Sequence, residues 1–178
     1  MRLYTKQILY TALFMTILMA GCGKNSKSSL DSNTTFTPIG TPQTLDFATW
    51  NLEWFGDPEN GPADDDLQFK NIQFVISGLE FDLWSLQEIT NGSTFQKLLD
   101  ELDEYDGFIA NDEFVINGPE YYSDYGNNEQ KVGLIYRPEI VTVQRAEVIL
   151  TDYDYEFAGR PPVEVQLSVT NRDITESF

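Results

Sequence analysis

Asn51 and Glu88 are the two residues whose types and positions best suit metal chemistry. Asn51 follows the alternating segment 45–50, and Glu88 follows the alternating segment 81–87. In an α/β sheet the C-terminal ends of neighbouring strands open into one crevice, where ligands bind. A carboxylate and an amide at that place could share one Mg²⁺, which takes oxygen ligands from one or two side chains and completes its shell with water and substrate phosphate. The spacing alone also fits a turn residue at Asn51 and a solvated strand end at Glu88.

The segments that must position these two residues predict a β-α-β unit. Residues 45–50 alternate apolar with small or polar side chains, as strands do. Residues 56–62 are rich in glycine and proline and predict a loop, and the acids at 64–66 then open a helix of roughly 15 residues. Residues 81–86 alternate with period two and predict a second strand. A strand, a helix and a strand in this order predict a crossover between parallel strands.

The rest of the chain predicts one more helix and several strands. The expected elements, in chain order, are a helix capped by Ser93 or Thr94, a weak strand over 108–116, a polar loop over 117–130, a central strand over 132–136, and strands over 141–150 and 163–169. No internal repeat is visible, so one folded domain is expected after residue 44.

The composition excludes several kinds of chemistry. Eleven Lys and Arg residues against 29 Asp and Glu give a formal charge of −18, too acidic for a protein that coats nucleic acid through a general basic surface. The absence of histidine excludes histidine-based acid–base catalysis, Ser-His-Asp triads and histidine metal sites within these 178 residues. Because Cys22 is the only cysteine, an intramolecular disulfide and a cysteine-cluster zinc site are excluded as well.

The N-terminal segment predicts export and lipid attachment. Arg2 and Lys6 precede an apolar run over residues 8–20, and small residues then meet Cys22. The run is shorter than the ~20 residues that a bilayer span needs, and residues 18–22 resemble a bacterial lipobox. We expect a signal peptide over 1–21, a lipid on Cys22, a flexible tether over 22–44, and a place in the bacterial cell envelope at the outer membrane or cell surface. The alternative is a buried apolar helix with an incidental cysteine.

Four segments in the folded part resemble a known family. They are Thr-Trp-Asn-Leu-Glu-Trp-Phe at 49–55, Trp-Ser-Leu-Gln-Glu-Ile at 84–89, Val-Gly-Leu-Ile-Tyr-Arg-Pro at 132–138 and Gly-Arg-Pro-Pro at 159–162. In order and approximate spacing they resemble the endonuclease/exonuclease/phosphatase superfamily, which has the DNase I-like fold. The resemblance implies an α/β (α+β) sandwich of two β-sheets flanked by helices.

The same resemblance implies a phosphodiesterase or phosphomonoesterase that uses Mg²⁺, or Mn²⁺ or Ca²⁺ in its place. It implies that Asn51 and Glu88 belong to the metal site, with Glu88 the principal ligand, and that Arg160 meets the substrate phosphate. An arginine suits that role because its guanidinium fork matches phosphate oxygens. The expected partners are a phosphate ester, with nucleic acid, a lipid headgroup or a small phosphodiester as candidates, and a membrane through the lipid anchor. No obligate protein partner is expected.

One departure from the family pattern sets the expected activity. The family uses two histidines and an Asp-x-Asn motif in the second half of its fold, and nothing after Leu167 resembles them. We therefore expect residues 45–178 to form the N-terminal part of such a domain, with the C-terminal half missing and the chain as given inactive. Whether the chain is an enzyme stays open. The alternative is a non-catalytic surface lipoprotein that uses the fold for binding or assembly.

Overall fold

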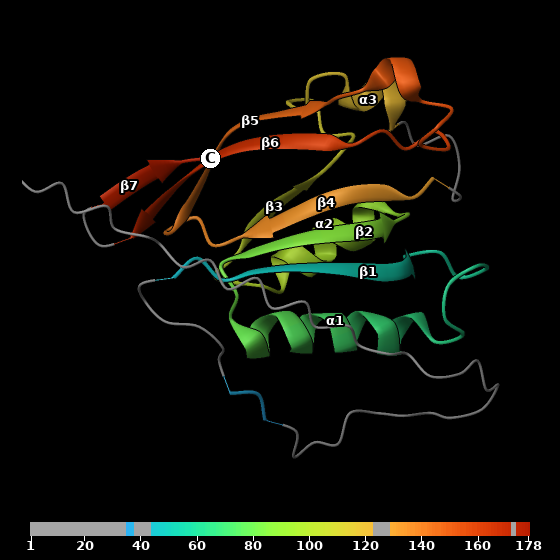
Figure 1. Ribbon diagram of the computed structural model, residues 1–178. Coiled ribbons are helices and arrows are strands. Elements are labelled where there is room, and N and C mark those ends of the chain that lie inside the picture. The colour runs from blue at the N-terminus through green and yellow to red at the C-terminus, as the bar shows by residue number, and fades with distance from the viewer. Residues whose placement is uncertain (1–34, 38–43, 123–128, 172–173) are drawn as a thin grey trace, which may run out of the picture.

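Two β-sheets lie face to face in the computed structural model, which describes residues 35–37, 44–122, 129–171 and 174–178. The first sheet has the order β1-β2-β4-β3, and the second has the order β5-β6-β7 (Figure 1). The strands span Phe47–Phe55 (β1), Leu83–Ile89 (β2), Asp106–Ile109 (β3), Lys131–Tyr136 (β4), Val141–Val148 (β5), Val163–Asn171 (β6) and Ile174–Ser177 (β7). The helices are α1 (Asp65–Leu79), α2 (Gly92–Asp100), the one-turn α3 (Gly118–Tyr121) and the 3₁₀ turn η1 (Thr151–Tyr153).

The predicted β-α-β unit is confirmed. Strands β1 and β2 pair in parallel, and the 15-residue helix α1 connects them. The Asp64 side chain caps α1 by accepting a hydrogen bond from the Leu67 amide at 3.0 Å, and Asp65 and Asp66 occupy the first turn. Carboxylates at a helix N-terminus stabilise its unpaired amides and dipole, so the acidic run starts the helix where the sequence indicates.

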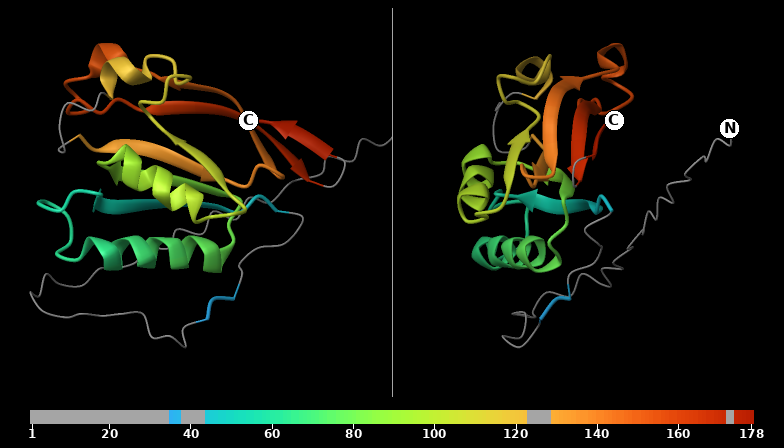
Figure 2. Two further views of the ribbon diagram at one scale, coloured as in Figure 1. Left: turned by 180° about the vertical axis from the view of Figure 1, so that it is seen from behind. Right: turned by 90° about the vertical axis from the view of Figure 1, so that its left-hand side faces the viewer.

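Alternation along the strands separates two apolar cores. Helices α1 and α2 pack on one face of the first sheet through Ile72, Ile76 and Leu98. The second sheet packs on the opposite face, where Leu134 of β4 lies in the same cluster as Val148 of β5. Figure 2 shows both helices on the side of the first sheet that faces away from β5 and β6. The expected sandwich of two sheets with flanking helices is therefore confirmed.

Several element boundaries differ from the prediction. Asn91, not Ser93 or Thr94, caps α2, because its side chain accepts from the Thr94 amide at 2.9 Å. The weak strand expected over 108–116 is the shorter β3, and a helical turn, α3, lies within the loop expected over 117–130. Strand β7 was not expected, and it pairs antiparallel with β6.

The N-terminal predictions meet the structure only at residues 35–37 and 44 of the predicted tether. Cys22, the predicted signal peptide and most of the predicted tether lie outside the described residues. Within the tether, the Phe36 ring lies 5.0 Å from the ring of Phe74 on α1. No helix in the described part of the chain is long and apolar enough to cross a membrane.

Candidate functional site

The ends of β1 and β2 place Asn51 beside Glu88. Asn51 is the last residue of β1 in regular register, paired with Gln87, and pairing resumes only at Phe55 and Ile89. Between these two pairs β1 has residues 52–54, whereas β2 has Glu88 alone. This bulge turns the polar side chains toward one another, and the Asn51 Nδ2 atom donates to Glu88 Oε1 at 2.8 Å. The prediction that both strands deliver side chains to one place is confirmed, although β1 continues past Asn51 to Phe55.

The backbone around this contact has an unusual conformation. Glu53, Trp54 and Glu88 have φ of 52°, 55° and 61°, in the left-handed region that disfavours residues with a β-carbon. Each such residue costs about 1–2 kcal/mol and persists only where its surroundings hold it. Here the Glu53 amide donates to Asn51 Oδ1 at 2.8 Å, and the Trp54 amide donates to Glu88 Oε2 at 3.2 Å. Strained backbone of this kind is concentrated at functional sites, so the bulge is a candidate site in its own right.

The donor set suits a cation that uses few protein ligands. Glu88 supplies a carboxylate that accepts two hydrogen bonds and has further lone pairs, and Asn51 supplies an amide oxygen. Glu88 is half-buried and Asn51 is exposed, so water and a ligand reach both. Among the described residues, no group of three or more His, Cys, Asp or Glu side chains could enclose a metal ion. The arrangement therefore fits a cation such as Mg²⁺ that is held by one or two side chains and completes its shell with water.

Arg160, the third predicted site residue, does not touch this pair. It is exposed in the turn after η1, and its guanidinium donates to the Gln130 side-chain oxygen. Gln130 precedes Lys131, which pairs with Ile89 at the end of β2. Among the described residues, no hydrogen bond or ion pair joins Arg160 to Asn51 or Glu88. The structure thus brings the two predicted metal-site residues together, and it joins Arg160 not to them but to Gln130 at the start of β4.

A buried tyrosine anchors the Arg160 turn. The Tyr122 hydroxyl donates to the Pro161 carbonyl at 2.6 Å. Burial raises the pKa of Tyr122 to about 12, while the positive charge of Arg160 acts in the opposite direction. The tyrosine is therefore neutral at physiological pH and serves as a hydrogen-bond donor beneath the arginine.

Sequence reasoning missed two polar residues that support the site. Lys131 and Thr90 are 0% and 4% exposed, and the Lys131 Nζ atom donates to the Thr90 carbonyl at 3.3 Å. In the sequence Lys131 directly precedes the apolar strand expected over 132–136, and a charged residue at that position indicates a strand end rather than a buried lysine.

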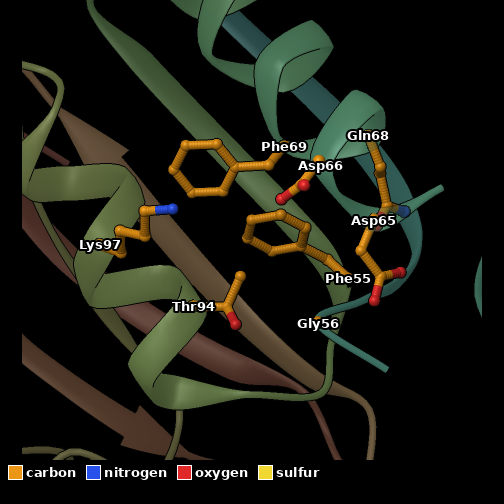
Figure 3. Close-up of a pocket in the computed structure, with 8 residues that line it drawn as sticks. All are labelled: Phe55, Gly56, Asp65, Asp66, Gln68, Phe69, Thr94 and Lys97. Atoms are coloured by element: carbon orange, nitrogen blue, oxygen red, sulfur yellow. The ribbon is translucent and has the colours of Figure 1, made fainter. Parts of the chain in front are cut away.

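A pocket elsewhere on the surface does not belong to this site. It lies between the N-terminal turn of α1 and the helix α2, and Figure 3 shows the Asp65 and Asp66 carboxylates at one side and Lys97 at the other. The Lys97 ammonium lies 4.5 Å from the centroid of the Phe69 ring. Asn51, Glu88 and Arg160 are not among the lining residues.

Comparisons with known proteins concern the fold. No protein-family model and no curated protein sequence matches this chain. The endonuclease/exonuclease/phosphatase from Bacteroides vulgatus is similar in structure, with a TM-score of 0.46 and 20% identity, over 70% of this chain and 44% of that one. The human Nocturnin catalytic domain with bound sulfate is similar with a TM-score of 0.45 and 16% identity, over 72% of this chain and 45% of that one. This chain thus spans less than half the length of either structure.

Proposed function

We propose that this chain carries the divalent-cation and phosphate-binding part of a metal-dependent phosphoric ester hydrolase. The observation that carries the proposal is the contact between Asn51 and Glu88 at the ends of two parallel strands, built on strained backbone. A carboxylate held by an amide and a backbone N–H, and open to solvent, is a suitable ligand for Mg²⁺, Mn²⁺ or Ca²⁺.

Each residue has a separate role in this proposal. Glu88 supplies the negative charge that attracts the cation, and Asn51 orients the carboxylate and offers a neutral oxygen. A divalent ion at this place would polarise a phosphate oxygen and stabilise the charge that develops during ester hydrolysis. Arg160 contacts the phosphate, since a guanidinium repels a cation and matches phosphate oxygens. For this purpose Arg160 has to leave its contact with Gln130 or share it.

The absence of histidine favours a second candidate function. None of the 178 residues can supply an imidazole as general base or acid. The residues that are present support binding of a cation together with a phosphate group. A surface protein that binds a phosphate ester without turning it over is therefore the alternative, and it uses the same three residues.

The site would face the outside of the cell in either case. We propose that Cys22 is lipidated after cleavage of residues 1–21 and that this lipid anchors the domain at a membrane of the bacterial cell envelope. The proposal rests on the charged, then apolar, then small residues that precede this cysteine. Metabolic labelling with a fatty-acid analogue is expected to label the wild type and not Cys22→Ser. Equal labelling of both would contradict the anchor.

Metal titration and hydrolysis together test the function. The full chain is titrated with Mn²⁺, and release of nitrophenol from bis(nitrophenyl) phosphate is followed with Mg²⁺ or Mn²⁺. Glu88→Gln keeps the size of the side chain and removes its charge, and Glu139→Gln, exposed after β4, is the matched control. We expect binding that Glu88→Gln weakens and Glu139→Gln does not, with hydrolysis no greater than background.

The outcomes test the cation site and the activity separately. Metal-dependent hydrolysis that Glu88→Gln abolishes would show that the chain is an active enzyme. Mn²⁺ binding that depends on Glu88, without hydrolysis, agrees with both candidate functions. Equal Mn²⁺ affinity of the wild type and Glu88→Gln would contradict both.

A further inference from the structure

A buried lysine joins the ends of the three strands beneath the candidate site. The Lys131 ammonium, at the start of β4, donates to the Thr90 carbonyl, directly after β2. The Thr90 amide and hydroxyl both donate to the carbonyl of Phe55, the last residue of β1, at 2.9 and 2.8 Å. All three residues are almost fully buried, with exposures of 0%, 4% and 1% for Lys131, Thr90 and Phe55. We call Lys131, Thr90 and Phe55 the strand-end clasp.

The clasp holds the chain shortly after the strained residues. Phe55 directly follows Trp54 and lies two residues after Glu53, and Thr90 lies two residues after Glu88, so each of the three left-handed positions is within two residues of a fixed point. Regular pairing is interrupted at this place on both sides of β2, between Asn51 and Phe55 of β1 and between Leu86 and Ile89 of β2 opposite β4. Glu88 itself has no register partner on either neighbouring strand, so the chain is held across three strands directly after it, by Ile89, which pairs with Phe55 and Lys131, and by the clasp at Thr90.

The same lysine lies next to the residue that holds Arg160. Gln130, which precedes Lys131, accepts a hydrogen bond from the Arg160 guanidinium. A shift of the start of β4 would thus move the arginine contact and the end of β2 together. This connection links the proposed cation residues to the proposed phosphate residue through the buried Lys131 and its partly exposed neighbour Gln130.

A lysine is an expensive residue at this position. A buried ammonium loses its hydration, whereas a methionine of similar length would fill the same space without that cost. The ammonium makes a polar contact to the Thr90 carbonyl, which an apolar side chain cannot make.

We propose that Lys131 is a positioning residue for the cation site, acting on Glu88 through Thr90 and Phe55. The identity of the ligand, a divalent cation, rests on the proposed function. The positioning itself is a property of the chain and is measurable without any ligand. Removal of groups that orient a metal ligand typically lowers metal affinity by about 10–100-fold, which sets the size of the effect expected here.

The test compares Lys131→Met with Lys131→Arg in the full chain. Lys131→Met removes the donor, Lys131→Arg keeps the charge and donors, and Lys70→Met, exposed on α1, is the control for the loss of one positive charge. Mn²⁺ titration gives the affinity, and hydrogen exchange gives the protection of the Thr90 and Trp54 amides. We expect Lys131→Met to weaken Mn²⁺ binding about tenfold or more and to speed exchange of these two amides, with β5 and β6 unchanged. Lys131→Arg is expected to restore most of both, and Lys70→Met to match the wild type.

The outcomes distinguish this inference from the proposed function. If the wild type and Glu88→Gln bind Mn²⁺ equally, the proposed function fails. Hydrogen exchange of the Thr90 and Trp54 amides then still tests whether Lys131 positions the ends of the strands. Unchanged exchange of these amides, or unchanged Mn²⁺ affinity where the wild type binds at Glu88, overturns the inference. If Lys131→Met does not fold, Thr90→Val takes its place, because it removes the hydroxyl that donates to the Phe55 carbonyl. Wild-type Mn²⁺ affinity and wild-type amide exchange in Thr90→Val would also overturn the inference.

Discussion

The side-chain amide of Asn51 lies 2.8 Å from the Glu88 carboxylate, which joins two residues that are 37 positions apart in the chain. Because the Trp54 amide binds the second oxygen of the same carboxylate, both oxygens of Glu88 have a fixed direction before any ligand arrives. A ligand group that is oriented in advance loses less entropy on binding than a mobile one. If a cation binds at Glu88 as proposed, this contact would favour Glu88 over the many exposed carboxylates of this acidic chain.

Asn51→Asp is expected to make folding stability depend on divalent cations. The substitution removes the donor to Glu88 and sets a second carboxylate beside it. Loss of a hydrogen bond to a charged group, with added repulsion, should lower the free energy of unfolding by roughly 1–3 kcal/mol in a metal chelator. Mn²⁺ should restore it, since two carboxylates bind the ion more strongly than one. Thermal unfolding with and without Mn²⁺ is the measurement, and identical unfolding in both conditions would count against a cation site.

Arg160→Ala is expected to reduce phosphate binding and to leave the metal affinity unchanged. The arginine is exposed, and among the described residues its guanidinium hydrogen-bonds to Gln130 alone, so its removal should cost little stability. Titration with inorganic phosphate in the presence of Mn²⁺ gives the affinity, with Arg145→Ala on β5 as the control for charge. Loss of a guanidinium contact to an anion is worth about 1.5–3 kcal/mol, which corresponds to a decrease of roughly tenfold or more. An equal effect of both substitutions would indicate general electrostatics rather than a phosphate contact.

The β-α-β unit could be predicted from the sequence because its signals are local. Alternation in β1 and β2 and the acids before α1 act within a few residues, and the structure agrees with each. The bulge could not be predicted, because nothing in residues 52–54 indicates a left-handed backbone. Glu53 and Trp54 are not the residue types that favour positive φ, and they adopt it because contacts to Asn51 and Glu88 hold them there.

The supporting residues of the site escaped prediction for the same reason. Burial of Lys131 depends on the pairing of β4 with β2, which brings together residues about 40 positions apart. Asp57 is a further case: it lies in an acidic stretch typical of a solvated loop, yet it is buried and accepts from Asn60 Nδ2 at 2.8 Å. Its hydrogen bonds to Asn60 and Glu59 lower its pKa, so the carboxylate stays charged inside the turn.

Gly78→Ala is expected to release Phe36 from α1. A β-carbon at Gly78 would overlap the Phe36 ring, which also packs against Phe74. Alanine normally stabilises a helix by about 0.5–1 kcal/mol relative to glycine, so the helix itself should not suffer. Limited proteolysis should cut more rapidly around residue 36 in Gly78→Ala and in Phe36→Ala. The double variant should match either single variant, and a fully additive effect would contradict direct contact.

Three tyrosines predict a loss of stability at alkaline pH. Burial raises the pKa of Tyr105, Tyr122 and Tyr136 from an ordinary value of 10.0 to about 12 in each case. A raised pKa means that the folded state holds the proton more tightly, so this stabilisation is complete below pH 10.0 and disappears as the pH rises to about 12. Thermal unfolding should decrease over that interval, and Tyr122→Phe should weaken the decrease. A wild-type transition that is independent of pH there would contradict the raised values.

Glu53→Gly tests whether the bulge stores strain. The Glu53 backbone has φ 52°, and glycine adopts this conformation without the clash that a β-carbon causes. Its hydrogen bond to Asn51 uses the backbone amide, which glycine retains. Since a left-handed residue costs about 1–2 kcal/mol, relief of the strain should raise the free energy of unfolding by roughly 1 kcal/mol, reduced by the greater freedom of glycine in the unfolded chain.

Ala158→Gly, at φ 53° outside the bulge, is the matched control for relief of strain elsewhere. Denaturant unfolding measures the stability of both variants, and Mn²⁺ titration measures their metal affinity. Glu53→Gly should bind Mn²⁺ less tightly, because a relaxed backbone holds Asn51 and Glu88 less firmly. Ala158→Gly should bind Mn²⁺ as the wild type does. A glycine in the regular part of β1 would lower stability. If Glu53→Gly lowers it in the same way, the backbone at Glu53 is not strained and does not need the contacts to Asn51 and Glu88 to hold it.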